Sequence, residues 1–231
     1  MSVASTSHQT PNTFGNVTIA SDTTFTTGLG ETCYHPLTFN IYNLNFIKLN
    51  TLFEVYSFTS AISVSIVNTT CQSQYQIAGA AFSIFQYDGN NSVYSPVYIS
   101  IQSSTFNTFS MGILRSSDDI ILEIEMRDSF FGYNNHDSGW SLVSVYSGNI
   151  IMDNIHVSGG GPIYDNGGGW EHTINITNSY LSQLMMPDEA FYLLFDKLYL
   201  SNCVFSNITS RTSPIIASFG GQCTIDNTTF I

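Results

Sequence analysis

A short pattern recurs about every 25 residues along almost the whole chain of 231 residues. Each copy reads apolar, any, apolar, any, polar, any, any, apolar, and the polar residue is most often Asn. This polar position falls at residues 21, 43, 68, 103, 128, 154, 178, 202 and 227, with spacings of 22, 25, 35, 25, 26, 24, 24 and 25. A nearly constant period of this length indicates stacked structural repeats, in which each repeat contacts only its neighbours.

Each copy begins with the period-two alternation of a half-buried β-strand and ends at a polar residue suited to a bend. Between the copies lie second apolar stretches that indicate further strands, at 53–56, 81–85, 141–146 and 214–218. Only residues 187–196 have a composition that could form even a short helix. The chain is therefore predicted to be all-β, a parallel β-helix of about nine coils of roughly 25 residues.

The spacings also predict the organisation of the chain. Residues 1–15 precede the first copy and are predicted to be an N-terminal extension, and residues 16–231 are predicted to form a single β-helix domain. The one spacing of 35 contains the turn-forming pairs Asp88-Gly89 and Asn90-Asn91. We therefore interpret residues 86–95 as an inserted, protruding loop.

Stacking in register places equivalent side chains above one another at about 4.8 Å, which predicts three apolar columns as the core. The first column comprises Val17, Phe39, Val64, Ile99, Ile124, Ile150, Ile174, Leu198 and Cys223. The second comprises Ile19, Ile41, Ile66, Ile101, Met126, Met152, Ile176, Leu200 and Ile225. The third comprises Phe46, Cys71, Phe106, Phe131, Val157, Leu181, Phe205 and Phe230.

Leucine-rich repeats have a comparable period and also place an Asn near a strand end. They use a different offset, L-x-L-x-x-N, and a return segment with its own Leu spacing. Here the Asn follows the second apolar residue by two positions, and the return segments are rich in Ser, Gly, Phe and Tyr. The pattern favours a β-helix.

Over residues 16–230 the chain resembles the right-handed parallel β-helix, or pectin-lyase-like, superfamily of pectate lyases, phage tailspikes and surface adhesins. The strand followed by Asn is similar to the inward, hydrogen-bonded asparagine ladder of that fold, with Ser21, Ser103 and Asp128 as variants. The ladder would consist of Asn43, Asn68, Asn154, Asn178, Asn202 and Asn227. The chain looks closer to the surface, adhesin or spike members than to the polysaccharide-degrading enzymes.

One acidic cluster interrupts an otherwise neutral outer face and comprises Glu123, Glu125 and Asp153, with Arg127 between them and Asp118-Asp119 in the preceding turn. The resemblance implies that carboxylates on this face could bind Ca²⁺ or form an acid/base pair. A lyase also needs a cationic group, and a glycosidase needs two carboxylates about 5 to 9.5 Å apart, one of them with a raised pKa.

The hydrolase signature of the superfamily joins Asp-Asp to Gly-His-Gly and Arg-x-Lys, and the sequence contains only Asp118-Asp119 of these. The pairs His136-Asp137 and Glu171-His172, with Asp165 between them in the sequence, lack the spacing of metal ligands. The favoured interpretation is a solvated surface cluster with no catalytic residue, no metal and no cofactor. The alternative is a lyase or hydrolase that uses Glu123, Glu125 and Asp153.

Composition and charge limit the kinds of partner and the cellular location that we expect. Only 10% of residues are charged, and 5 Lys and Arg against 17 Asp and Glu leave a net charge of −12, which argues against nucleic acid and anionic lipid. No apolar run is long enough to span a membrane, and residues 1–12 encode no secretion signal. Cys33, Cys71, Cys203 and Cys223 lack CxxC spacing; buried thiols are favoured over disulfides, whose pairing stays open.

Six sequons occur, and their positions in the repeat suggest which of them could carry glycan. We expect glycan at Asn16, Asn90, Asn175 and Asn207 but not at the ladder residues Asn68 and Asn227.

The last copy ends at Phe230-Ile231 without a polar or helical cap, and an open coil invites strand addition. The sequence therefore predicts an extracellular or cell-surface structural or adhesive glycoprotein. It would associate end to end or form part of a longer solenoid, with glycans as further candidate partners.

Overall fold

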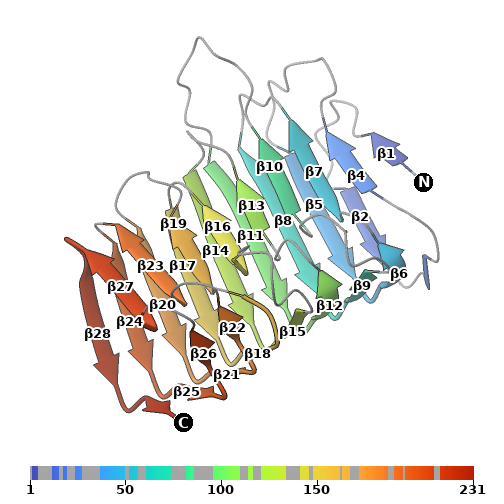
Figure 1. Ribbon diagram of the computed structural model, residues 1–231. Coiled ribbons are helices and arrows are strands. Elements are labelled where there is room, and N and C mark those ends of the chain that lie inside the picture. Colours follow the sequence, from blue (N-terminus) through green and yellow to red (C-terminus); the bar gives the residue numbers. More distant parts are fainter. Residues whose placement is uncertain are drawn as a thin grey trace.

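The computed structural model confirms the predicted fold class, because the chain forms a parallel β-solenoid (Figure 1). The structure describes residues 2–4, 12–15, 18–19, 24–27, 37–49, 52–56, 61–73, 82–85, 96–109, 114–116, 121–133, 141–145, 148–161, 163–166, 172–186, 190–194, 196–210 and 214–231. Within these ranges all regular elements are strands, and there is no helix of the length and apolarity that a membrane span requires.

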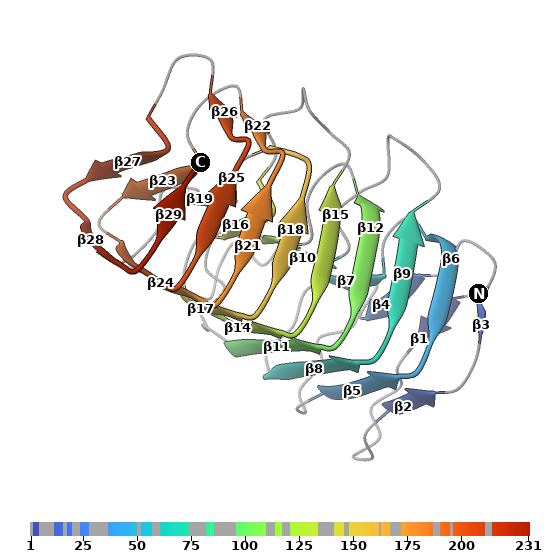
Figure 2. The same cartoon turned by 90° about the horizontal axis from the view of Figure 1, so that it is seen from below.

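Three sheets of nine strands each run along the solenoid, and the chain visits them in turn (Figure 2). Sheet 1 contains β1 (Ser2–Ala4), β4 (Thr24–Thr27), β7 (Phe53–Tyr56), β10 (Phe82–Phe85), β13 (Leu114–Ser116), β16 (Val143–Val145), β19 (Tyr164–Asn166), β23 (Phe191–Leu194) and β27 (Ile216–Phe219). Sheet 2 contains β2 (Asn12–Gly15), β5 (Leu37–Tyr42), β8 (Ile62–Val67), β11 (Pro96–Gln102), β14 (Ile121–Arg127), β17 (Gly148–Asp153), β20 (Thr173–Thr177), β24 (Lys197–Ser201) and β28 (Gln222–Asp226).

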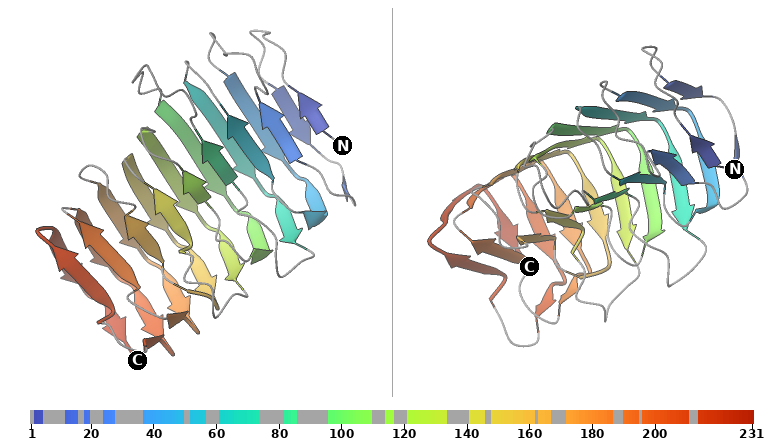
Figure 3. Two further views of the ribbon diagram at one scale, coloured as in Figure 1. Left: turned by 45° about the horizontal axis from the view of Figure 1, so that its top comes forward. Right: turned by 90° about the horizontal axis from the view of Figure 1, so that it is seen from above.

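Sheet 3 contains β3 (Thr18–Ile19), β6 (Asn45–Leu49), β9 (Thr70–Ser73), β12 (Thr105–Phe109), β15 (Phe130–Tyr133), β18 (His156–Ser158), β21 (Tyr180–Ser182), β25 (Val204–Ser206) and β29 (Thr229–Phe230). A further pair, β22 (Met185–Met186) and β26 (Thr209–Ser210), follows sheet 3 in the last coils. The two ends of the chain lie at opposite ends of the stack (Figure 3).

The predicted apolar columns are confirmed from Phe39 onward. Ile41, Ile66, Ile101 and Met126 pair in sequence across sheet 2, and the pairing continues through Met152 and Ile176 to Ile225. The first and third columns pair in the same way. Up to the last coil these side chains are at most 2% exposed. Each is worth about 1.5–3 kcal/mol of burial for a large aliphatic or aromatic side chain.

The prediction for the first copy is wrong in register. Phe14 in β2 pairs with Ile41, whereas the sequence placed Ile19 there, and Ile19 instead pairs with Phe46 in sheet 3. The alternation in β2 therefore begins five residues earlier than predicted. Strands β1 and β2 both pair within these sheets, in the range predicted to be an extension. Val17, Ser21 and the predicted loop 86–95 lie outside the described residues.

Sheet 1 supplies a fourth apolar column from the stretches between the copies. Phe82, Val143, Tyr164 and Phe191 are at most 1% exposed and lie in this sheet. The stretch 187–196, the one with some helical composition, forms strand β23 in its described part because Phe191 pairs with Ile216 and packs edge-on against Phe205. Burial of an aromatic side chain outweighs the small helix propensity of its neighbours.

The polar position of each copy lies at a sharp corner between sheets 2 and 3. The eight corner residues from Asn43 to Asn227 have φ between 43° and 53°, the left-handed region that Asn and Asp adopt most readily among residues with a side chain. The backbone N–H groups of the first seven continue the pairing of the sheets, for example from Asn154 to the Thr177 carbonyl at 3.0 Å. Conformation at the bend therefore explains the amide at this position.

The expectation that these side chains point inward is wrong. All six predicted ladder asparagines are exposed, because the left-handed bend turns the corner residue outward and the next residue inward. A ladder still forms on the surface. Asn68 Nδ2 donates to Asn43 Oδ1 at 2.6 Å, and Asn227 Nδ2 donates to Asn202 Oδ1 at 2.6 Å.

The buried ladder lies one residue later and is formed by the hydroxyl groups of Thr69, Ser104, Ser129 and Ser179, whereas Leu44, Ile155 and Cys203 occupy the same position in other coils. Ser104 Oγ accepts a hydrogen bond from the backbone N–H of Thr69 at 3.1 Å, and Ser129 Oγ accepts one from the N–H of Ser104 at 3.1 Å. Each hydroxyl donates to the carbonyl two residues before it, as Ser129 does to Arg127 at 2.6 Å. Buried polar atoms are thereby satisfied without an amide in the core.

Candidate functional site

An open groove follows the corner between sheets 2 and 3 in the middle of the solenoid. It is shallow, with an open volume of about 510 Å³, and crosses four successive coils. One wall is formed by the corner residues Ser103, Asp128, Asn154 and Asn178. We call this site the corner groove.

The other wall carries a row of aromatic rings on the outer face of sheet 3. Phe130, His156 and Tyr180 pair in adjacent strands, so their side chains lie above one another. The ring centroids are 5.1 and 5.0 Å apart, and the rings meet edge to face. Thr105 and Val204 occupy this row in the flanking coils, so the aromatic surface ends within the groove region.

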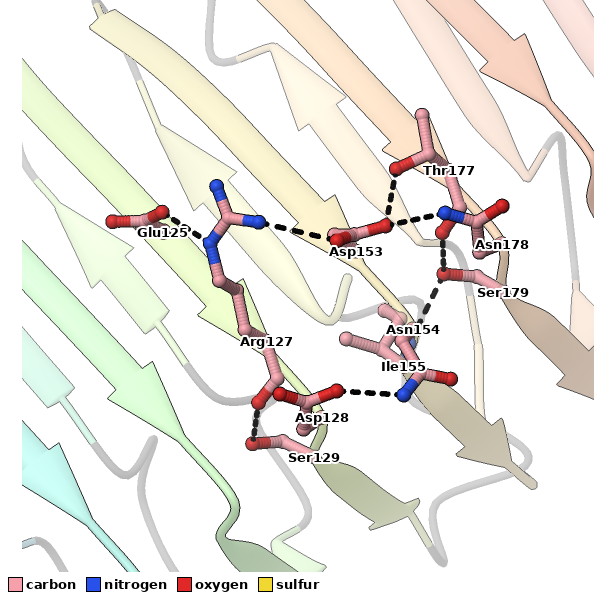
Figure 4. Close-up of polar contacts among 10 residues, drawn as sticks. All are labelled: Glu125, Arg127, Asp128, Ser129, Asp153, Asn154, Ile155, Thr177, Asn178 and Ser179. Atoms are coloured by element: carbon pink, nitrogen blue, oxygen red, sulfur yellow. Dashed lines mark hydrogen bonds and ion pairs between the residues drawn. The ribbon is translucent and has the colours of Figure 1, made fainter.

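The predicted acidic cluster lies next to this corner, on the outer face of sheet 2 (Figure 4). The Arg127 guanidinium contacts Glu125 and lies 3.1 Å from Asp153 Oδ2. Asp153 Oδ1 accepts hydrogen bonds from the Thr177 hydroxyl at 2.6 Å and from Asn178 Nδ2 at 2.8 Å. Two of the three predicted carboxylates are therefore joined through one cation.

These contacts hold Asp153 in its charged form. Hydrogen bonds from Thr177 and Asn178, and the positive charge of Arg127, lower the pKa of Asp153 below its ordinary value. The hydrogen bond and charge of Glu125 in turn raise the pKa of Arg127. A lowered pKa makes Asp153 a weaker base as well as an unsuitable general acid, because both roles favour a pKa closer to the working pH.

Glu123 is separate from this network. It lies two residues before Glu125 on the same outer face, and its Oε1 accepts a hydrogen bond from Asn149 Nδ2 at 2.9 Å. The Asp118-Asp119 pair lies outside the described residues. Within the described part of the chain, no group of three or more His, Cys, Asp and Glu residues is arranged to hold a metal ion.

Asp128, the acidic variant in the ladder, is exposed and accepts a hydrogen bond from Asn154 Nδ2 at 2.6 Å. Its carboxylate therefore has both solvent and an amide donor. Asn178 links the corner groove to the acidic network, because it donates a hydrogen bond to Asp153 and also lines the groove.

A buried polar cluster lies at the corner between sheets 1 and 2, where the chain enters strands β20 and β24 of sheet 2. His172 Nδ1 is 2.7 Å from the Tyr164 hydroxyl and 2.8 Å from Asp196 Oδ1, and His172 and Asp196 are fully buried. Asp196 also accepts hydrogen bonds from the backbone N–H groups of His172 and Leu194. Glycines flank the pair in adjacent coils: a Cβ on Gly148 would lie 1.7 Å from the Leu122 carbonyl oxygen, and one on Gly221 would lie 2.5 Å from that of Asp196.

His172 therefore contacts groups that the sequence analysis did not connect to it. Asp196 lies 24 residues later, one period of the repeat, and that spacing was the available signal. Because the side chains of Tyr164, His172 and Asp196 are buried and bonded to one another, we interpret this cluster as structural. Glu171, His136 and Asp137 lie outside the described residues.

The described cysteines are thiols. Cys71 and Cys203 are buried in the core, where desolvation raises the pKa of both, and Cys223 is exposed in the last coil. Cys33 lies outside the described residues.

Among the sequon residues, Asn175 points outward from β20, and Asn207 is exposed at a left-handed bend. Asn68 and Asn227 are exposed as well, so burial does not protect them. Asn16 and Asn90 lie outside the described residues.

Comparisons with protein-family models, with curated protein sequences and with solved structures each found no match.

Proposed function

We propose that this chain is a structural or adhesive solenoid that associates end to end through its C-terminal coil. It belongs, in this proposal, to the surface and adhesin type of the right-handed parallel β-helix superfamily and acts as a glycoprotein at the cell surface or outside the cell. The regular columns, the left-handed Asn corners and the outward sequon at Asn175 support this assignment.

The observation that carries the proposal is the exposure of core columns in the last coil. Ile225 and Phe230 are 47% and 39% exposed, although their column neighbours Leu200 and Phe205 are at most 1% exposed. Phe219 and Ile231 add further exposed apolar surface at 56% and 74%. Inside the solenoid such side chains are covered by the next coil, and in this proposal a second copy supplies that coil.

The same coil presents open sheet edges. Strands β27, β28 and β29 each form the edge of one nine-stranded sheet, while β1, β2 and β3 form the opposite edges. A second copy that pairs its first strands with these edges would continue all three sheets. Head-to-tail contact along the solenoid axis does not close into a ring, so repeated addition produces a filament. In a longer protein a following coil would cover the same face.

Electron microscopy and sedimentation velocity of the purified chain test this proposal. We expect concentration-dependent rods that lengthen by whole copies. The double substitution Ile225→Lys and Phe230→Lys should leave a folded monomer, because both side chains are exposed in the single copy. Tyr199→Lys is the matched control, since Tyr199 is 39% exposed but lies on the outer face of β24. A chain that stays monomeric, or a double variant that assembles normally, would refute end-to-end association.

The alternative function is a polysaccharide lyase or hydrolase that uses Glu123, Glu125 and Asp153. The observation in its favour is the position of Arg127 between Glu125 and Asp153, which brings the cationic group that a lyase needs together with two carboxylates on the outer face. Incubation with pectic and other acidic glycans, with and without Ca²⁺, tests it. Product release that is lost in Asp153→Asn would support the enzyme and argue against a purely structural role.

A further inference from the structure

We infer that a second copy docks with its first strands on the last coil in one fixed register, in which each sheet continues without a shift. This inference rests on the end-to-end association proposed above and specifies how the two copies meet. Three observations carry it: the order of the strands at the two ends, the register of the pairing within each sheet, and one backbone N–H group at the last corner.

The strands at the two ends of the stack follow the same order. Along the chain, β1, β2 and β3 belong to sheets 1, 2 and 3, and β27, β28 and β29 belong to sheets 1, 2 and 3 as well. Both sets pair parallel to their neighbours in those sheets. Figure 3 shows the two ends of the chain at opposite ends of the solenoid. A second copy that follows β29 therefore begins with a strand of sheet 1, which is the order in which each coil follows the previous one inside the chain.

Sheet 2 fixes the register of the contact. Phe14 in β2 pairs with Ile41, and the column of Ile41 continues without interruption to Ile225 in β28. Docking without a shift therefore places the second copy's Phe14 at Ile225, which is 47% exposed in the single copy. It also pairs Thr13 with Thr224, which share the adjacent column of the same sheet. A shift by one residue would place Phe14 against a residue of the outer face.

The other two sheets require the same register. Val3 in β1 belongs to the column that ends at Ile216 in sheet 1. Ile19 in β3 belongs to the column that ends at Phe230 in sheet 3. An unshifted contact thus matches an apolar residue of one copy with an apolar residue of the other in each sheet. Because the strands of a coil are joined, a shift in one sheet displaces the others, and the three matches are lost together.

One column of the contact differs from those inside the chain. Asn12 pairs with Phe39 and would fall opposite Cys223, where coils within the chain place two apolar residues. A polar residue in an apolar column weakens the contact. We therefore expect the copies to separate on dilution, whereas the coils of one chain stay stacked.

A backbone N–H group at the last corner identifies the same register. The first seven corner residues each donate this N–H to the carbonyl just before the next corner, as Asn202 does to Asp226 at 3.2 Å. Asn227 is the eighth, and among the described residues no further coil supplies a carbonyl to it. Gly15 pairs with Tyr42, which itself precedes a corner. In the unshifted contact the second copy's Gly15 carbonyl therefore lies where the Asn227 N–H needs an acceptor.

Disulfide cross-linking between two variants tests this register. One protein carries Thr224→Cys and the other carries Thr13→Cys, and both carry Cys223→Ala to remove the exposed thiol beside the contact. Paired residues in adjacent parallel strands lie about 4.8 Å apart, within the Cα separation that a disulfide needs. Sedimentation velocity first shows that the reduced mixture assembles. Mild oxidation should then form a covalent dimer in the mixture on a non-reducing gel, and neither variant alone should form it.

Asp226→Cys is the matched control for Thr224→Cys, because Asp226 lies two residues further along the same outer face of β28. In the unshifted register it would lie about 8 Å from the Thr13→Cys residue, which is too far for a disulfide. We expect the mixture that contains Asp226→Cys to give at most about a tenth of the covalent dimer.

Hydrogen exchange at the last corner gives a second measurement that needs no cysteine. The Asn227 N–H should exchange at least about tenfold more slowly in the assembled parent protein than in the dilute monomer, because assembly supplies its acceptor. The Asn154 N–H already donates to the Thr177 carbonyl, so it should change little and serves as the internal control.

Two results would overturn the inference while leaving end-to-end association intact: assembled copies in which Asp226→Cys cross-links as well as Thr224→Cys, or assembled copies in which neither cross-links. An Asn227 N–H that exchanges equally fast before and after assembly would contradict the expected hydrogen bond. A parent protein that does not assemble would instead refute the proposed function, and the inference with it.

Discussion

The middle coils and the last coil of the solenoid carry the same residue pattern in different surroundings. Ile176 in β20 is fully buried, whereas Ile225, two coils later in the same column, is 47% exposed. The inner face of a coil is covered partly by the coils on either side, and the last coil has a neighbour on one side. In a solenoid the burial of a side chain therefore depends on the coils stacked on both sides of it. Residues at the same position of the repeat contribute unequally to the stability of the fold.

The third column should show the largest effect of this difference. Phe131 is fully buried and stacks on Phe106 with ring centroids 5.7 Å apart, and Phe131→Ala should lower the free energy of unfolding by about 3–5 kcal/mol. Phe230→Ala, in the last coil, should cost less than about half of that, because the ring is 39% exposed. Urea unfolding of the monomer measures both. Equal losses would contradict the comparison.

The buried hydroxyl ladder offers a second comparison. Ser129→Ala removes the acceptor for the buried N–H of Ser104 and should cost about 1–3 kcal/mol. Thr228→Ala removes a longer, 3.4 Å contact to the N–H of Cys203 at the partly buried end of the ladder and should cost less than about 1 kcal/mol. Hydrogen exchange should show lost protection at Ser104 in the first variant. Unchanged protection there would refute the ladder's role.

The corner residues should behave alike in both regions, because backbone conformation is local. Asn154→Ala and Asn227→Ala each place Ala at positive φ, 51° and 43°, and should each cost roughly 1–2 kcal/mol. Asn154→Gly and Asn227→Gly should cost less than the Ala variants, since Gly adopts this region freely. Thermal unfolding of the four variants is the measurement. A cost confined to Asn154 would show that stacking of the side chains, rather than the bend, selects Asn.

The smallest effect concerns pH. The folded pKa of Asp153 lies below its unfolded value, so its contribution to stability is present above about pH 4 and is lost as the pH falls through the folded pKa. The free energy of unfolding should therefore fall less steeply in Asp153→Asn than in the parent as the pH is lowered below about 4. The difference should be less than about 1 kcal/mol, because the ion pair of Arg127 and Asp153 is partly exposed. Asp226→Asn, in the same column of the last coil, is the matched control. An unchanged acid limb in Asp153→Asn would contradict this assignment.

The sequence predicted the strands and columns well because both depend on local alternation and on a constant period. A slip of one residue would turn Ile66 and Ile101 from the core to the solvent, so register is strongly specified where one face is apolar. The first copy shows the limit of this reasoning. There the alternation 17–21 competes with Phe14, and the pairing of Phe14 with Ile41 decides the register.

The site could be predicted only in part. The cluster of Glu125, Arg127 and Asp153 followed from the outward positions of two adjacent strands, and the structure joins them. The groove beside it was missed, although the spacing of Phe130, His156 and Tyr180 follows the same period. The sequence analysis predicted that the corner asparagines point inward, because a ladder of buried amides could satisfy its own hydrogen bonds. The sequence pattern does not distinguish such a buried ladder from the exposed one that the structure shows.

The sequence by itself therefore determined the fold class, the period and which residues share a column. Only the tertiary structure decided which side of a bend faces the core, how Asn178 reaches Asp153, and where the columns become open to solvent. The physical reason is that alternation specifies the two faces of a strand, whereas a positive φ redirects the chain at each corner. The neighbours of every residue then come from coils about 25 positions away.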